Sequence, residues 1–146
     1  MARLSISFIA LVACVSGSIC VPARARDGTG SADAAFYLFG ASWCAPCLAE
    51  LRDIDAIADA AAPLPLIVLW DDEAPASALR TNRRNVKFYQ GAPARVVRDR
   101  LQRDAAGLPY SVLVDADGIV CGERNGPLSA AWVARLKQGC RSLAGK

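Results

Sequence analysis

Cys44 and Cys47 are the residues of this sequence best suited to chemistry, because they enclose Ala45 and Pro46 in a Cys-X-X-Cys arrangement. The apolar run 36–39 before them predicts a buried strand, and the spacing of apolar residues after them predicts a helix. A cysteine at the start of a helix faces unpaired N–H groups and the positive end of the helix dipole, which favour the thiolate over the thiol. We therefore expect Cys44 to be the nucleophile in thiol-disulfide exchange and Cys47 to resolve the resulting mixed disulfide.

The rival interpretations of this pair are a static disulfide and half of a zinc site. A zinc site would need Cys121 and Cys140 as further ligands, and their spacing is not that of a zinc knuckle. The chain has no histidine, which excludes histidine ligands, haem ligation through histidine and general base catalysis by histidine. We expect no metal and no cofactor.

Residues 1–25 have the pattern of an export signal. A basic start at Arg3 precedes an uncharged apolar stretch over 4–21, and the small residues that follow suit a cleavage site after Ala25. Removal of this segment, which holds two arginines, leaves fifteen basic and fourteen acidic residues and a net charge of +1. Such a balance indicates no nucleic-acid partner.

Two other fates of this segment would attach the protein to a membrane. Residues 11–14 resemble the lipobox of bacterial lipoproteins, which would place a lipid anchor on Cys14, although the apolar stretch continues past this cysteine. The apolar run is also just long enough to stay in the membrane as a helix. All three fates place the domain outside the cytoplasm, and membrane association requires an uncleaved or lipidated N-terminus.

The rest of the chain divides into a polar linker at 26–35 and one domain at 36–146, which is long enough to bury a core. The patterns predict, in order, a strand at 36–39, a helix at 44–62, a strand at 64–70, two helical pieces within 75–106, strands at 111–114 and 119–123, and a last helix capped by Ser129. With right-handed crossovers, this order predicts an α/β fold with a mixed sheet and helices on both faces.

Two separate segments resemble one known family. Residues 39–50, Phe-Gly-Ala-Ser-Trp-Cys-Ala-Pro-Cys-Leu-Ala-Glu, are similar to the active-site segment of the TlpA/ResA type of thioredoxin-like proteins. These are extracytoplasmic thiol-disulfide oxidoreductases, often tied to cytochrome c maturation. Residues 107–120, continuing to 126–129, look like the same family's segment around the cis-proline loop and hairpin. The resemblance covers most of residues 36–140 and implies a thioredoxin-like fold.

The resemblance also implies roles for single residues. Pro109 would be a cis-proline facing the cysteine pair, and Leu108 would present backbone groups to a bound peptide unless it is only a core leucine. Glu50 would handle protons at the active site, although a carboxylate near a helix N-terminus is also explained by the helix dipole. Leu38 stands where thioredoxin itself has a buried aspartate, which leaves the proton acceptor of the second cysteine open. Trp43 would contribute to substrate docking, shield the sulfur pair, or do both.

Cys121 and Cys140 are the other two cysteines that remain after removal of the signal. An even count in an oxidising compartment predicts that they form a second, structural disulfide. The competing interpretation is a second redox pair that relays electrons.

The leading functional hypothesis is a reductase or isomerase that acts on disulfides of exported proteins. Its substrates would be protein thiols and disulfides, and a membrane protein would supply its electrons. An oxidase with the same residues comes second, because a small change in thiolate stability shifts the reduction potential. A thiolate metal carrier or a non-catalytic binding module would be a different class. The carrier is disfavoured because the family's copper carriers add a histidine, which this chain lacks.

Overall fold

The structure is a computed structural model that describes residues 34–76, 80–102 and 107–140. Strand β1 (Ala35–Gly40) lies at the centre of one sheet, parallel to β2 (Leu66–Trp70) and antiparallel to β4 (Tyr110–Val114). At the edges, β3 (Val86–Gln90) pairs parallel with β2, and β5 (Val120–Asn125) pairs antiparallel with β4. The order β3-β2-β1-β4-β5 confirms the expected mixed sheet.

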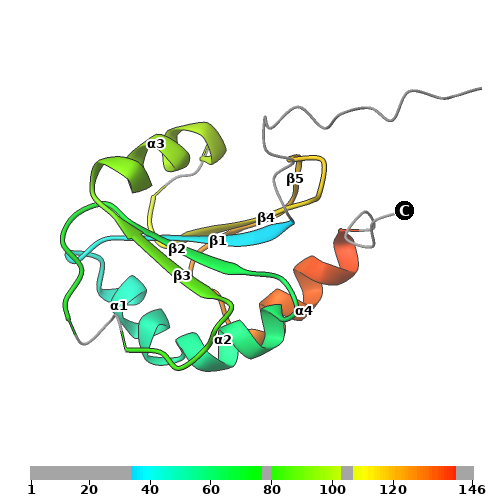
Figure 1. Ribbon diagram of the computed structural model, residues 1–146, viewed down its shortest axis with the longest axis horizontal. Coiled ribbons are helices and arrows are strands. Elements are labelled where there is room, and N and C mark those ends of the chain that lie inside the picture. The colour runs from blue at the N-terminus through cyan, green and yellow to red at the C-terminus, as the bar shows by residue number, and fades with distance from the viewer. Residues whose placement is uncertain (1–33, 77–79, 103–106, 141–146) are drawn as a thin grey trace, which may run out of the picture.

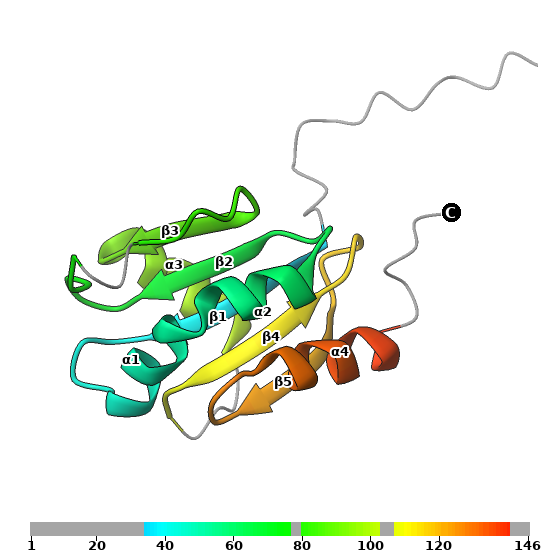
Figure 2. The ribbon, with the colours of Figure 1, turned by 90° about the horizontal axis from the view of Figure 1, so that it is seen from below.

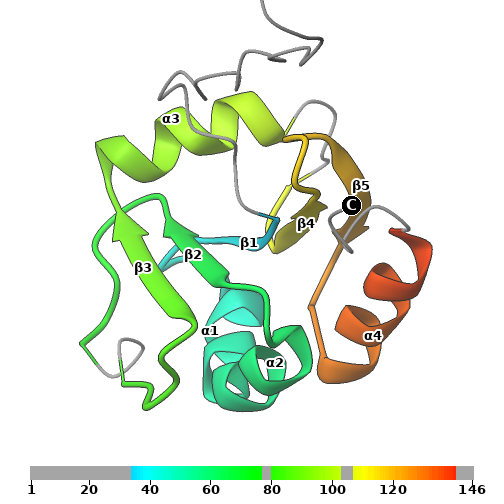
Figure 3. The same cartoon turned by 45° about the vertical axis from the view of Figure 1, so that its right-hand side comes forward.

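Helices cover both faces of this sheet, as Figure 1 shows. Helix α3 (Ala92–Leu101) lies alone on one face, while α1 (Ala45–Arg52), α2 (Ile54–Ala61) and α4 (Ala130–Gly139) lie on the other. Seen from below, α2 lies between β2 and β4, and α4 runs beside β5 (Figure 2). Figure 3 separates the three layers, which are α3, the sheet, and the group of α1, α2 and α4. The predicted α/β architecture with helices on both faces is confirmed.

Each face of the sheet has its own apolar core. The core under α1, α2 and α4 includes Phe36, Leu38, Cys47, Ile57, Trp70 and Val133. The core under α3 consists of Phe39, Leu69, Ala94, Tyr110, Val112 and Val114. Strand β1 is therefore buried on both sides, which explains why its residues form an uninterrupted apolar run rather than an alternating one. This central strand ends four residues before Cys44 and holds the cysteine pair on a rigid support.

Gly40, the last residue of β1, allows the close approach of the largest buried side chain. It is paired in register with Trp70 at the end of β2, and a Cβ atom at Gly40 would lie 2.3 Å from the Trp70 ring. Real Cβ contacts are not this short, so the sheet needs glycine here. On its outer side Trp70 also contacts Phe88 of β3, with 6.1 Å between the ring centroids.

The structure corrects the prediction that residues 75–106 form two helical pieces. Within 75–76 and 80–102, the part of this range that the structure describes, only the second piece is present, as α3, and residues 86–90 form the edge strand β3. These five residues are too few to show a period, and their conformation is set by hydrogen bonding to β2. The break predicted near 91–93 is the junction between β3 and α3, where Gly91 is the N-cap of α3 and Pro93 lies in its first turn.

The other predicted elements are present with shifted boundaries. The single helix expected at 44–62 is two short helices that meet at Asp53, which is the C-cap of α1 and the N-cap of α2. The second strand begins at Leu66 rather than residue 64, and the hairpin strands are β4 and β5. Ser129 caps α4 as predicted, since its side chain accepts a hydrogen bond from the Trp132 backbone N–H.

The signal predicted at 1–25 and nearly all of the linker predicted at 26–35 lie outside the described residues. Within the described ranges, no helix has both the length and the apolar character needed to cross a membrane.

Candidate active site

Cys44 is the N-cap residue of α1, four residues after the end of the central strand. Its backbone is extended, its C=O accepts the Leu48 N–H at 3.1 Å, and its Sγ accepts the Cys47 N–H at 3.2 Å. Pro46 occupies the first helical turn, where a missing N–H leaves no bond unmade. The sulfur of Cys44 thus lies where a helix offers free donors and the positive end of its dipole.

Cys44 and Cys47 are joined in a disulfide, with Cα atoms 5.2 Å apart. Cys44 is 4% exposed and Cys47 1%, so the first cysteine is only slightly more open than the second. The residues around them are exposed, and Trp43 is exposed to 71%. An indole this open shields the sulfur pair little, which favours the docking interpretation of Trp43 over the shielding one.

The loop before β4 carries the other predicted docking residues. The Leu108–Pro109 peptide bond is cis, as the family resemblance implied for Pro109. The Pro109 carbonyl accepts the Gly126 N–H at 2.9 Å, which ties this loop to the end of β5. Leu108 is half-buried and packs against both apolar cores, so it has the structural role that the core interpretation gave it.

Glu50 lies on the buried face of α1, one turn after Cys47, and is 4% exposed. Its Oε1 accepts the Leu128 backbone N–H, and its Oε2 has no hydrogen-bond partner among the described residues. Burial raises the pKa of Glu50 from 4.5 to about 7, while the Leu128 hydrogen bond and the Arg124 charge lower it. A carboxyl with this pKa gains and loses its proton near neutral pH, as a proton-transfer group must.

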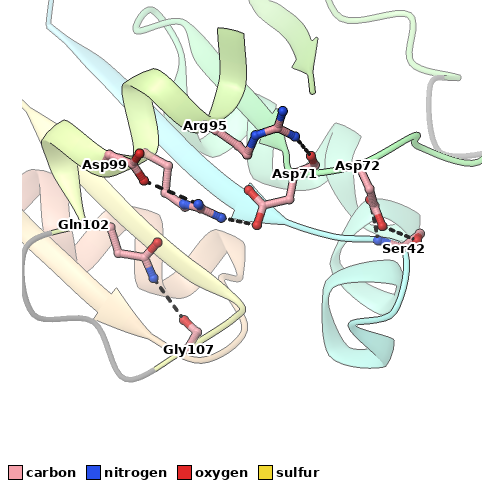
Figure 4. A network of polar contacts seen from close by, with 8 residues as sticks. Ser42, Asp71, Asp72, Arg95, Asp99, Gln102 and Gly107 are labelled. Atoms are coloured by element: carbon pink, nitrogen blue, oxygen red, sulfur yellow. Dashed lines mark hydrogen bonds and ion pairs between the residues drawn. The ribbon is translucent and has the colours of Figure 1, made fainter. Parts of the chain in front are cut away.

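Sequence reasoning missed Asp71 and Asp72, which follow β2 at the same end of the sheet as the cysteine pair. Asp72 accepts two hydrogen bonds from Ser42, one from its N–H at 2.9 Å and one from its hydroxyl at 2.5 Å (Figure 4). The hydroxyl bond is the main cause of the lowered pKa of Asp72. The sequence did hold a signal for them, namely two carboxylates directly after a buried parallel strand. The carboxyl ends of parallel strands meet at one edge of the sheet, where sites form.

Cys121 of β5 and Cys140, the C-cap of α4, are bonded to one another, with Cα atoms 5.3 Å apart. Cys140 is buried and Cys121 half-buried. The bond joins the last strand to the last helix, away from the N-terminus of α1. No group of three or more potential ligands suited to a metal ion occurs in the parts of the chain that the structure describes.

No protein-family model matches this chain, and no curated protein matches it significantly. Solved structures do. StoA from Bacillus subtilis is 17% identical with a TM-score of 0.55, covering 72% of this chain and 82% of that one. A secreted Mycobacterium tuberculosis disulfide oxidoreductase, described as homologous to E. coli DsbE, is 21% identical with a TM-score of 0.52, covering 71% and 79%. Bradyrhizobium japonicum ScoI with copper bound is 17% identical with a TM-score of 0.51, covering 73% and 85%.

These identities are low, so the likeness shows the fold and nothing finer. The chain has a thioredoxin-like fold, as the resemblance of its two segments implied. The same fold carries a disulfide oxidoreductase in one neighbour and a bound copper ion in another. The activity has to be argued from the residues around Cys44.

Proposed function

We propose that this protein is a thiol-disulfide oxidoreductase that reduces or isomerises disulfides of exported proteins through Cys44 and Cys47. The observation that carries the proposal is the position of Cys44 as the N-cap of α1, with the Cys47 N–H 3.2 Å from its sulfur. A thiolate at this position is stabilised by free helix donors and the dipole, which makes it a nucleophile near neutral pH.

The reduced protein would act in two steps that together transfer two electrons. The Cys44 thiolate attacks one sulfur of the substrate disulfide, forms a mixed disulfide and releases the first substrate thiolate. The Cys47 thiolate then attacks Cys44 Sγ, which forms the internal disulfide and releases the second substrate thiol. The protein ends in the oxidised form of the structure, and a dithiol donor must return two electrons before the next turnover.

Glu50 is the best candidate for the proton acceptor of Cys47, since Leu38 occupies the position of the aspartate in thioredoxin. The carboxyl lies one helical turn below Cys47, is buried with it, and has a pKa of about 7. In its ionised form it would take the Cys47 proton before the second step and lose it again when the pair is reduced. Oε2, which has no hydrogen-bond partner in the described part of the chain, is the atom that would accept the proton.

Trp43, Leu108 and Pro109 would form the surface that receives the substrate. The exposed indole precedes the nucleophile, and the loop 107–109 lies before the strand that pairs with β1. By the family resemblance, the backbone of Leu108 pairs with an extended substrate segment. Such pairing would orient the substrate disulfide toward Cys44 for in-line attack.

The proposed location is outside the cytoplasm, with a membrane protein as electron donor. The export pattern of residues 1–25 supports this, as does the secreted neighbour from Mycobacterium tuberculosis. Protein recovered from the exported fraction should begin at Arg26. A lipid-bearing Cys14 or an intact Met1 would contradict cleavage and support one of the two membrane-attached fates.

Trapping of intermediates tests the roles of the two cysteines. Cys47→Ser should lose turnover on a protein disulfide such as insulin and accumulate mixed disulfides, because the nucleophile remains and the resolving thiol is gone. Cys44→Ser should lose turnover without trapping. If Cys44→Ser traps substrates and Cys47→Ser does not, the roles are reversed. If neither variant loses activity, the oxidoreductase proposal is wrong.

A thiolate metal carrier is the second candidate, and the copper-bound neighbour is the observation that favours it. The absence of histidine from the chain weighs against it. Adding a cuprous ion to the reduced protein separates the two functions. Tight binding that requires both cysteines, together with no activity on protein disulfides, would replace the oxidoreductase proposal by the carrier.

A further inference from the structure

Polar side chains of α3 reach the segment that follows β2. Arg98 forms an ion pair with the Asp71 carboxylate, and Arg95 donates to the Asp71 backbone carbonyl at 2.9 Å (Figure 4). The side chains of Arg98 and Asp71 are 24% and 20% exposed, so this pair is largely withdrawn from solvent. Both the side chain and the backbone carbonyl of Asp71 are therefore bonded to α3.

The same segment is bound to the turn that carries the nucleophile. The Asp71 N–H donates to the Gly40 carbonyl at 3.0 Å. The Asp72 carboxylate accepts from the N–H and the hydroxyl of Ser42, which lies two residues before Cys44. A continuous chain of contacts therefore runs from α3 through Asp71 and Asp72 to the cysteine turn.

The C-terminal end of α3, one turn beyond Arg98, contacts the proline loop. Gln102, the C-cap residue, donates from Nε2 to the Gly107 carbonyl at 3.5 Å, the longest contact of the network. Leu101 and Leu108 also pack into the same apolar core under α3. One helix is thus linked to both loops on which the substrate is proposed to dock. It contacts the proline loop directly, and it reaches the cysteine turn through Asp71 and Asp72.

We propose that Asp72 and Arg98 are positioning residues, through which α3 sets the separation between the cysteine turn and the Pro109 loop. This inference rests on the proposed function. Because a substrate segment must fit between these loops, their separation determines how well its disulfide meets Cys44. The Ser42–Asp72 bonds lie at the surface, where such contacts add little to global stability. Removing these bonds should therefore lower the capture of substrate and leave global stability nearly unchanged.

The reactivity of Cys44 has a separate origin and should not depend on α3. It comes from the N-terminus of α1, which lies on the opposite face of the sheet. A small alkylating reagent needs only an accessible thiolate, whereas a protein disulfide needs both loops in place. Comparing the two substrates separates positioning from reactivity.

The experiment measures kcat/KM for a protein disulfide and the alkylation rate of Cys44 in full-length variants. Asp72→Ala removes both bonds to Ser42. Asp72→Asn keeps them, because its carbonyl accepts the Ser42 N–H and its amide donates to the Ser42 hydroxyl. Glu73→Ala is the matched control, since Glu73 is the exposed neighbouring carboxylate. Arg98→Gln interrupts the same chain of contacts at α3, and urea unfolding checks that each variant is folded.

We expect Asp72→Ala to lower kcat/KM about five- to tenfold, the loss of roughly one net hydrogen bond, with alkylation within about twofold of wild type. Arg98→Gln should act in the same direction, and Asp72→Asn and Glu73→Ala should match wild type. An active wild type with Asp72→Ala as active as Glu73→Ala overturns this inference alone. A parallel loss of alkylation also overturns it, because Asp72 would then act on the thiolate. A wild type without exchange activity refutes the proposed function and this inference with it.

Discussion

The protonation state of Glu50 can be tested through the stability of the folded protein. The carboxyl is 4% exposed, and its one hydrogen-bond partner among the described residues is the Leu128 N–H, at Oε1. Burial raises its pKa from 4.5 to about 7, because the charged form loses hydration and Oε2 finds no partner in the described ranges to replace it. The ionised carboxyl therefore destabilises the folded state, and the protonated carboxyl does not.

The sign and size of the effect follow from proton linkage. A group with a raised pKa binds its proton more tightly in the folded than in the unfolded chain. The stability that this provides is fully present below pH 4.5 and is lost as the pH rises through about 7. One pKa unit corresponds to ~1.4 kcal/mol, so the complete loss is about 3 kcal/mol. Glu50→Gln keeps the shape of the side chain and an acceptor for Leu128 but cannot ionise, so it should escape this loss.

Urea unfolding of the oxidised protein between pH 4 and pH 8 measures the difference. The free energy of unfolding of Glu50→Gln should equal that of wild type at the acidic end, apart from a constant offset for the buried amide. At the alkaline end the variant should have gained about 3 kcal/mol over wild type, the full linkage effect. Glu73→Gln, at an exposed carboxylate, is the matched control for the loss of one acidic side chain. A pH-independent difference for Glu50→Gln would refute the argument that Glu50 ionises near neutral pH at the expense of stability.

Three further substitutions test other parts of the structure. Gly40→Ala should destabilise the protein by about 1–3 kcal/mol in urea, because its Cβ would overlap the Trp70 ring; unchanged stability would contradict the close approach at this position. Replacing both Cys121 and Cys140 by Ala should cost about 3 kcal/mol of stability, given their separation of 19 residues, while exchange activity should persist if the bond is structural. Loss of activity with unchanged stability would favour the electron relay. Trp43→Ala should lower kcat/KM for a protein disulfide but change stability by less than about 0.5 kcal/mol, since the indole is 71% exposed; equal kcat/KM would remove Trp43 from the docking surface.

The central strand and the start of α1 could be predicted from the sequence because their signals are local. The uninterrupted apolar run 36–39 requires burial on both faces, and Pro46 and the N-cap position of Cys44 mark a helix start within a few residues. Ser129 as the cap of α4 is a signal of the same kind. In each case the signal lies within a few consecutive residues, so that segment alone is enough to predict the element.

Residues 86–90 and Glu50 show what only the tertiary structure decides. Strand β3 is recognisable through its pairing with β2 and the contact of Phe88 with Trp70, both of which involve residues far away in the chain. Burial raises the pKa of Glu50, and the Leu128 N–H, 78 positions further along, lowers it, so the value depends on residues that only the fold brings together. The link from Arg98 through Asp71 to the turn at Ser42 likewise joins three segments that are adjacent only in space. The sequence by itself thus determined the candidate residues for the chemistry. Packing between distant segments decided their protonation and placement, because burial and charge pairing depend on neighbours in three dimensions.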